Sequence, residues 1–206
     1  MSGTPPIPVA LADLACETRH VAPAATYPRR PPAFANLDLV APEDRRALEA
    51  RWHAPDQGAP PIDLHRLGAA SIAFPGLVHL PDGSAILESL HNLPRARTAA
   101  LLARGPRAAA TIPGDAPALL LARAGSGNYG HWLVEHLGAL LLLRDAAPDL
   151  APRLLVQDRR GHAIWPVLEA GVALAGFDPA ALLPVGPAGV GVRDLWMFSP
   201  ASATPT

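Results

Sequence analysis

Residues 118–158 read ALLLARAGSGNYGHWLVEHLGALLLLRDAAPDLAPRLLVQD, and this stretch decides the fold. The run at 118–124 is apolar apart from one arginine, which predicts a strand buried on both faces of a sheet. Residues 129–145 carry the long apolar pattern of a buried helix, and the run at 153–158 predicts a second strand. A helix between two such strands predicts a parallel pair joined by a crossover.

The neighbouring segments extend this unit in both directions. Residues 164–176 predict a second helix and VGVRDLWMF at 190–198 predicts a third strand. We therefore expect an α/β fold in which residues 118–198 form a Rossmann-like, parallel β-α-β-α-β lobe. Residues 62–117 contain short apolar stretches around the turn sequence Pro-Asp-Gly-Ser, which predicts a small β-rich subdomain with a hairpin.

The two ends of the chain have a different composition. Residues 1–61 hold 11 of the 25 prolines, which donate no backbone hydrogen bond and disfavour helix just before them. We therefore expect a Pro-rich irregular arm with one short helix at 42–52, which begins with proline and two acidic residues. Residues 199–206 are expected to be a polar tail.

The composition also limits the class of partner. Only 17% of the 206 residues are charged and the formal net charge is −1, which argues against a nucleic-acid surface. The single cysteine, Cys16, and the lack of a secretory signal favour a reducing, cytoplasmic location. No apolar run reaches the ~20 residues of a membrane span, so we expect no transmembrane segment. All 17 Lys and Arg positions are arginine, a bias that makes each arginine weak evidence for function.

Three glycines spell a dinucleotide-binding pattern. Gly125, Gly127 and Gly130 form G-x-G-x-x-G between a predicted strand and a predicted helix, which is where such a cradle belongs. However, the bulky His131 follows the third glycine, and the candidate acidic residue, Asp158, lies well beyond the usual spacing of about 20 residues. The sequence therefore predicts no bound cofactor, while a nucleotide-cofactor enzyme stays open as an alternative.

Polar side chains gather at the start of the first helix. Asn128 is placed to cap the helix through its side-chain oxygen, and His131 and Glu135 are i, i+4 neighbours on the same face. The positive end of the helix dipole there suits an anionic ligand. On residue chemistry alone, a purely structural reading is favoured over a functional one: Asn128 only caps the helix, and His131 bonds a neighbouring backbone group. Trp132, followed by the leucine run, is expected to point into the core.

Other chemistries lack the residues that they need. His131, Glu135 and His136 form H-x-x-x-E-H rather than the H-E-x-x-H of metalloproteases, and a five-residue step on an α-helix turns the two histidines about 140° apart. We therefore expect no metal site. The G-x-S-x-G serine of hydrolases and the G-x-x-x-x-G-K-[ST] phosphate loop are also absent from the sequence.

The sequence Asn128-Tyr129-x-His131-Trp132 after a strand resembles the N-terminal signature of glycosyltransferase family 61, a bacterial family associated with capsular polysaccharide biosynthesis. The resemblance covers roughly residues 119–198. It implies inverting transfer of a sugar from a nucleotide-sugar donor to a glycan or other hydroxyl acceptor. It places Asn128, Tyr129, His131 and Trp132 at the cleft between two lobes, with Glu135 adjacent.

Two departures from the family pattern affect this expectation. The family often has Leu-Pro-Arg after the motif, whereas this chain has Leu137-Gly138-Ala139, so a contact made by that arginine is in doubt. A family member also continues into a second lobe with a His-Gly-Ala motif, whereas this chain stops at SPASATPT. We therefore expect that this chain is a truncated form, lacks the donor-binding lobe, does not catalyse transfer alone, and tends to self-associate.

Three functions follow from these patterns. In the first, a glycosyltransferase, His131 is the better candidate for the base that deprotonates the acceptor, because the pKa of an unperturbed histidine lies near neutral pH. Glu135 is the second candidate, and Asn128, Tyr129 and Trp132 are the candidate substrate-binding residues. In the second, the chain is a non-catalytic binding or assembly module. In the third, it is a Rossmann nucleotide-cofactor enzyme that uses the glycine loop.

Overall fold

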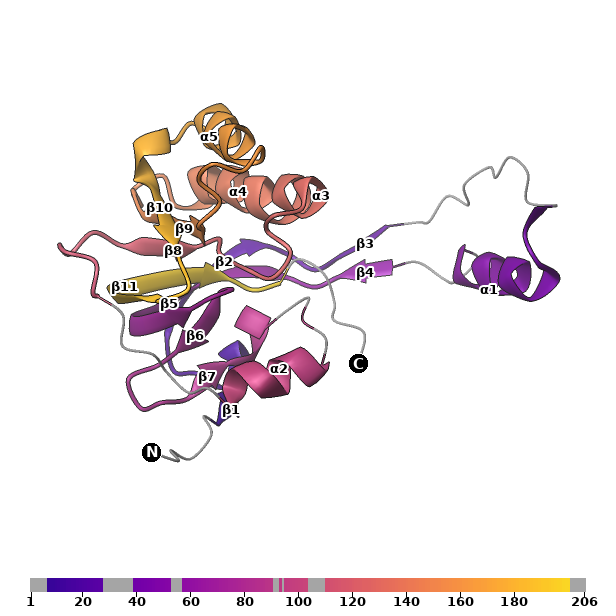
Figure 1. Ribbon diagram of the computed structural model, residues 1–206, viewed down its shortest axis with the longest axis horizontal. Coiled ribbons are helices and arrows are strands. Elements are labelled where there is room, and N and C mark those ends of the chain that lie inside the picture. The colour runs from indigo at the N-terminus through magenta and orange to yellow at the C-terminus, as the bar shows by residue number, and fades with distance from the viewer. Residues whose placement is uncertain are drawn as a thin grey trace.

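The computed structural model describes residues 7–27, 39–52, 57–90, 93, 95–103 and 110–200. Within this part of the chain, nine strands form one mixed sheet in the order β1-β7-β6-β5-β11-β8-β9-β10, with β2 paired to β5 (Figure 1). The strands are β1 (Pro8–Val9), β2 (Glu17–Ala22), β5 (Ile62–Ala73), β6 (Leu77–His79), β7 (Ala85–Ile86), β8 (Ala118–Leu120), β9 (Arg153–Gln157), β10 (Leu182–Val185) and β11 (Val190–Phe198). The predicted α/β class is confirmed.

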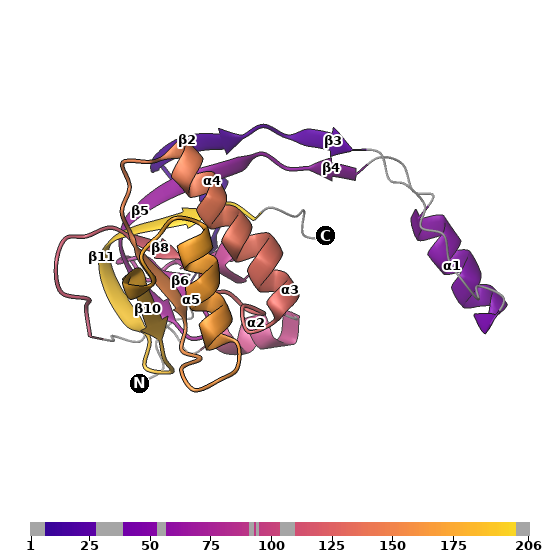
Figure 2. The same cartoon turned by 90° about the horizontal axis from the view of Figure 1, so that it is seen from above.

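The strands β8, β9 and β10 are parallel and are joined by helical crossovers. A continuous helix made of α3 (Tyr129–His131), η4 (Trp132–Leu137) and α4 (Gly138–Ala146) joins β8 to β9, and α5 (Trp165–Leu174) lies between β9 and β10. The first two predicted strands and both predicted helices are therefore confirmed. Both crossovers lie on the same side of the sheet (Figures 1 and 2).

The third strand of the parallel unit differs from the prediction. The predicted strand at 190–198 is confirmed as β11, which pairs parallel with β8, but it lies on the other side of β8 from β9 and also pairs antiparallel with β5. The strand that follows β9 in the sheet is instead β10. Strand β10 has only four residues and includes Pro184, so it carries little strand signal. A proline is tolerated there because β10 is the last strand in the sheet order.

Each face of the parallel strands is buried, as expected for continuous apolar runs. Leu119 and Leu154 face the crossover helices and pack with Trp132, Leu140 and Leu168. Leu120 and Leu155 face the other way, onto a second cluster to which β5, β6 and β7 contribute Ile72, Val78 and Ile86. One face is thus covered by helices and the other by the curled antiparallel part of the same sheet.

The N-terminal segment is more regular than predicted. Strand β2 pairs with β5, β1 pairs with β7, and β3 (Ala25–Tyr27) and β4 (Gln57–Ala59) form a two-stranded ribbon that points away from the main sheet (Figure 2). The predicted helix at 42–52 is confirmed as α1 (Pro42–Trp52). The prediction of an irregular arm is therefore wrong where these strands lie. Pairing with distant partners overrides the local proline signal.

The sheet runs across the predicted boundary between residues 117 and 118, because β5 pairs with β11 over most of its length. The proposed division into 1–61, 62–117 and 118–198 remains a prediction. Of the predicted tail at 199–206, residues 201–206 lie outside the described part. The remaining helical elements are η1 (Leu11–Asp13), η3 (Leu87–Leu90), α2 (Arg95–Leu102) and η5 (Pro179–Ala181). In the described ranges, every helix is too short or too polar to cross a membrane.

Candidate active site

The centre of the candidate site is a hydrogen-bonded pair of side chains. His131 Nδ1 lies 2.8 Å from Glu135 Oε1, which confirms the i, i+4 relation expected from the sequence. An ionised carboxylate only accepts hydrogen bonds, so Nδ1–H is the donor and Nε2 of the neutral ring is left with its lone pair. The side chain of His131 is 38% exposed and that of Glu135 is 19% exposed. The pair therefore has the arrangement of a general base and its orienting partner.

A π-helical segment, η4, begins directly after His131, carries Glu135 and interrupts the α-helical pattern between α3 and α4. Such segments are rare and occur frequently at functional sites. Within it, the Trp132 and His136 rings stack at 5.7 Å between centroids. The sequence predicts a helix at 129–145 but carries no recognisable signal for the wider turn.

The start of the helix is capped as predicted. Asn128 has extended backbone angles, and its Oδ1 accepts a hydrogen bond of 2.8 Å from the Gly130 N–H. Tyr129, the next residue, is 56% exposed. By contrast, Trp132 is 1% exposed and lies in the core beneath the helix. Four of the five predicted site residues therefore lie at the exposed end of the helix or on its accessible face, and Trp132 does not.

The glycine-rich loop packs against side chains of this protein. Gly125 has a φ of +90°, and a Cβ there would lie 3.2 Å from the His131 ring. A Cβ at Gly127 would lie 3.1 Å from Arg159 Nη2. Close approach to His131 and Arg159 thus accounts for two of the three glycines without a bound dinucleotide.

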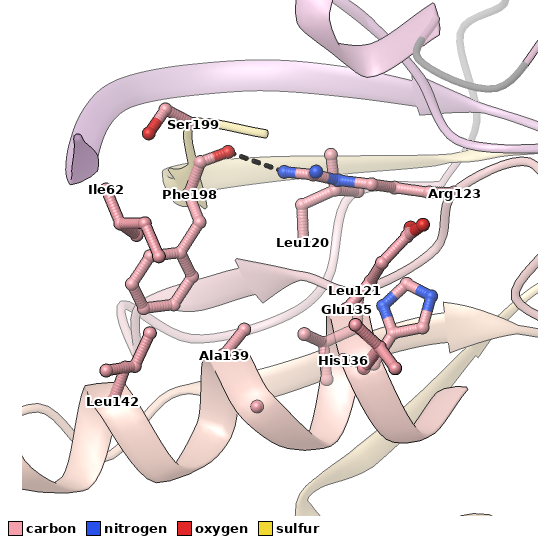
Figure 3. A pocket seen from close by; sticks show the side chains of 12 residues that line it. Ile62, Leu120, Leu121, Arg123, Glu135, His136, Ala139, Leu142, Phe198 and Ser199 are labelled. Atoms are coloured by element: carbon pink, nitrogen blue, oxygen red, sulfur yellow. Dashed lines mark hydrogen bonds between the residues drawn. The ribbon is translucent and has the colours of Figure 1, made fainter. Parts of the chain in front are cut away.

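A pocket of about 100 Å³ opens beside the pair (Figure 3). Its polar end is formed by Arg123, which follows β8, together with Glu135 and His136 from η4. Its apolar end is formed by Ile62, Ala139, Leu142 and Phe198. Glu135 therefore belongs both to the His131 pair and to the pocket wall.

Arg123 is held in place by the sheet. It is 7% exposed, and its Nη2 donates a hydrogen bond to the carbonyl oxygen of Phe198 at the end of β11. The Gln157 amide donates a 2.8 Å hydrogen bond to the Arg123 carbonyl oxygen and thereby fixes the backbone after β8. Burial lowers the pKa of the guanidinium, while Glu135 and Glu88 act in the opposite direction.

His136 is the most perturbed histidine of this site. It is 2% exposed, and its Nε2 has no hydrogen-bond partner among the described residues. Burial lowers the pKa of this imidazole to about 4, and the positive charge of Arg123 contributes in the same direction. The ring is therefore neutral at neutral pH.

We expect the free energy of unfolding to decrease as the pH falls from about 6.5 to about 4, because the unfolded chain then binds a proton at His136 that the folded protein excludes. The difference between these two pKa values corresponds to about 3 kcal/mol. Urea unfolding at about pH 7 and about pH 4.5 should show a smaller loss for His136→Leu than for the wild type. Equal losses in both proteins would contradict the assignment.

Other buried histidines also contribute to the pH dependence of stability. Burial lowers the pKa values of His65 and His79, so the His136→Leu variant should retain part of this pH dependence. His162→Leu, at an exposed position, is the matched control and should follow the wild-type pH dependence.

Sequence reasoning missed Arg123 and His136 as site residues. Arg123 is the one charged residue in the apolar run at 118–124, which was the available signal, but the arginine bias of the chain weakened it. In the sequence, His136 stands out only as a possible metal ligand in the H-x-x-x-E-H pattern. Among the described residues, no group of three histidine, cysteine or acidic side chains is arranged to hold a metal ion.

A scan against protein-family models, a search of curated proteins and a search of solved structures each find no match to this chain.

Proposed function

We propose that this chain carries the acceptor-activating part of a glycosyltransferase with a Rossmann-like lobe, similar to family 61. The observation that carries the proposal is the 2.8 Å contact between His131 and Glu135. The pair follows the loop after β8, at the carboxyl edge of the parallel strands, where α/β sheets commonly bind their ligands. The N-Y-x-H-W resemblance supplies the reaction class.

In the proposed reaction, His131 Nε2 removes the proton from an acceptor hydroxyl as its oxygen attacks the anomeric carbon of the donor sugar. The new glycosidic bond forms while the bond to the diphosphate breaks, so the configuration inverts and a nucleoside diphosphate leaves. Glu135 holds the ring through Nδ1 and stabilises the imidazolium that forms. Asn128 and Tyr129 lie at the start of the same helix and are proposed to contact the acceptor.

Trp132 has a different role in this proposal from the one that the resemblance implies. Its ring is buried against the core and stacks on His136, so it supports the helix from behind. We therefore propose acceptor contacts for Asn128 and Tyr129 and a structural role for Trp132.

Titration calorimetry with the full chain tests the proposal against the two alternatives. Saturable binding of nucleotide sugars, but not of free nicotinamide dinucleotides, supports a glycosyltransferase. Binding of a nicotinamide dinucleotide instead supports a cofactor enzyme that uses the Gly125–Gly127 loop. If neither class binds, the cofactor-enzyme alternative fails. The effect of His131→Ala on the rate of a polypeptide that transfers sugar then decides between the acceptor-activating part of a transferase and a non-catalytic module.

A further inference from the structure

We infer that the pocket beside the candidate active site binds a small organic acid, with its carboxylate against Arg123 and His136 and its short apolar body against Phe198. This inference is independent of sugar transfer, since it uses neither the base function of His131 nor a nucleotide. It is carried by three observations: a buried cation, a buried imidazole nitrogen without a partner, and an apolar wall opposite them.

The first observation concerns the charge of Arg123. A charged group is rarely buried unless it is paired, because transfer from water is costly. Arg123 is 7% exposed. Among the described residues, no carboxylate oxygen lies within 4.0 Å of a guanidinium nitrogen of Arg123, the limit for an ion pair. Its Nη2 donates to the Phe198 carbonyl, and a guanidinium carries five N–H donors. A carboxylate is the ligand whose two oxygens match that planar group.

The second observation is the nitrogen of His136. Nε2 is buried and lacks a partner in the described part of the chain. Because the pKa of His136 is about 4, the neutral ring can present Nε2–H as a donor without the cost of burying a second cation. Arg123 and His136 both line this pocket, and Figure 3 shows the Glu135 carboxylate beside the His136 ring and the Arg123 guanidinium turned toward Phe198. A ligand in the pocket can therefore contact both groups.

Glu135 also lines this end of the pocket, but its carboxylate does not occupy the position proposed for the carboxylate of the bound acid. Its carboxylate is hydrogen-bonded to His131 and forms no ion pair with Arg123 within the described residues.

The third observation sets the size and character of the rest of the ligand. Ile62, Ala139, Leu142 and Phe198 form an apolar end that an inorganic anion would leave unused. The volume is about 100 Å³, and a cavity of about 150 Å³ is known to hold benzene. An acid with roughly four carbon atoms therefore fits, whereas a nucleotide or a disaccharide does not.

Butyrate is the probe for this site, with butyramide as a control of the same shape that lacks the charge. Titration of the full chain, followed by NMR, should show saturable one-to-one binding of butyrate with a Kd on the order of 1 mM or lower. Butyramide should bind about 10–100-fold more weakly, as should phosphate, because hydrogen bonds to charged groups are the stronger ones and phosphate has no apolar body.

Two substitutions locate the binding, and a third is the control. Arg123→Met removes the charge and Ala139→Leu fills the apolar end, so each should weaken butyrate binding by about tenfold or more. Arg193→Met removes an arginine whose side chain is 66% exposed and which does not line this pocket, so it should leave the affinity unchanged. If Arg123→Met does not fold, Ala139→Leu and the butyramide comparison still test the inference.

Three results would contradict the proposed acid site. Absence of saturation at about 10 mM butyrate, equal affinity for butyramide, or unchanged butyrate affinity in folded Ala139→Leu would each remove the acid site. None of these results bears on nucleotide-sugar binding, so a failure here is distinguishable from a failure of the proposed function.

Discussion

Replacing His131 with alanine is expected to lower the rate of sugar transfer by about 10²–10⁴-fold without unfolding the protein. The side chain is partly exposed, so its loss costs little packing, whereas the acceptor hydroxyl loses the group that takes its proton. The measurement is the initial rate of nucleoside diphosphate release, with this chain assayed within a polypeptide that transfers sugar. A folded variant with near-normal turnover would remove His131 from the mechanism.

The structure offers a matched control for this substitution. His20 and Asp63 form a second histidine–carboxylate contact of 2.8 Å, between β2 and β5. His20→Ala therefore removes the same type of pair on strand β2, at a residue that does not line the pocket, and transfer should be unchanged. Equal loss of rate in both variants would indicate a general electrostatic or folding effect.

Glu135 tests whether the partner orients the base. Glu135→Gln keeps a side chain of the same length but removes the charge that would stabilise a protonated His131. We expect an intermediate rate and a changed pH–rate profile, because the imidazolium loses its counter-charge. A purely structural role would lower stability and leave the shape of the pH–rate profile unaltered.

The sequence was sufficient to predict this pair, and the reason is local. The spacing of His131 and Glu135 places them one turn apart on any helix, and Asn128 ahead of them is a cap by residue type. Predicting the His131–Glu135 contact and the Asn128 cap therefore required only that residues 129–145 be helical. The apolar runs at 118–124 and 153–158 predict their strands just as directly, because strands buried on both faces of a sheet contain few polar residues.

The features that escaped prediction depend on distant parts of the chain. Arg123 becomes significant only because Phe198 from β11 and His136 from η4 meet it at one pocket. Strand β10 is stabilised by pairing with β9, β1 by pairing with β7, and β2 by pairing with β5. Neither a local residue pattern nor a propensity contains such pairings.

Replacing Trp132 with alanine is expected to destabilise the protein by about 3–5 kcal/mol, the range found for large aromatic side chains removed from cores. The ring is 1% exposed and packs in the cluster that joins the helices to the sheet. Chemical denaturation, followed by far-UV circular dichroism, should show a lower midpoint. Tyr129→Ala, at a 56% exposed aromatic three residues earlier, should change stability by only about 0.5 kcal/mol or less.

The glycine opposite the ring makes this prediction more specific. A Cβ at Gly171 in α5 would lie 2.9 Å from Trp132 Nε1, which is closer than real contacts of this kind. Gly171→Ala should therefore destabilise the wild type despite the gain of about 0.5–1 kcal/mol that alanine normally gives in a helix. In the Trp132→Ala background the obstruction is gone, so the same substitution should stabilise the protein. A double-mutant cycle measures this coupling, and additive effects would show that the ring does not pack against α5.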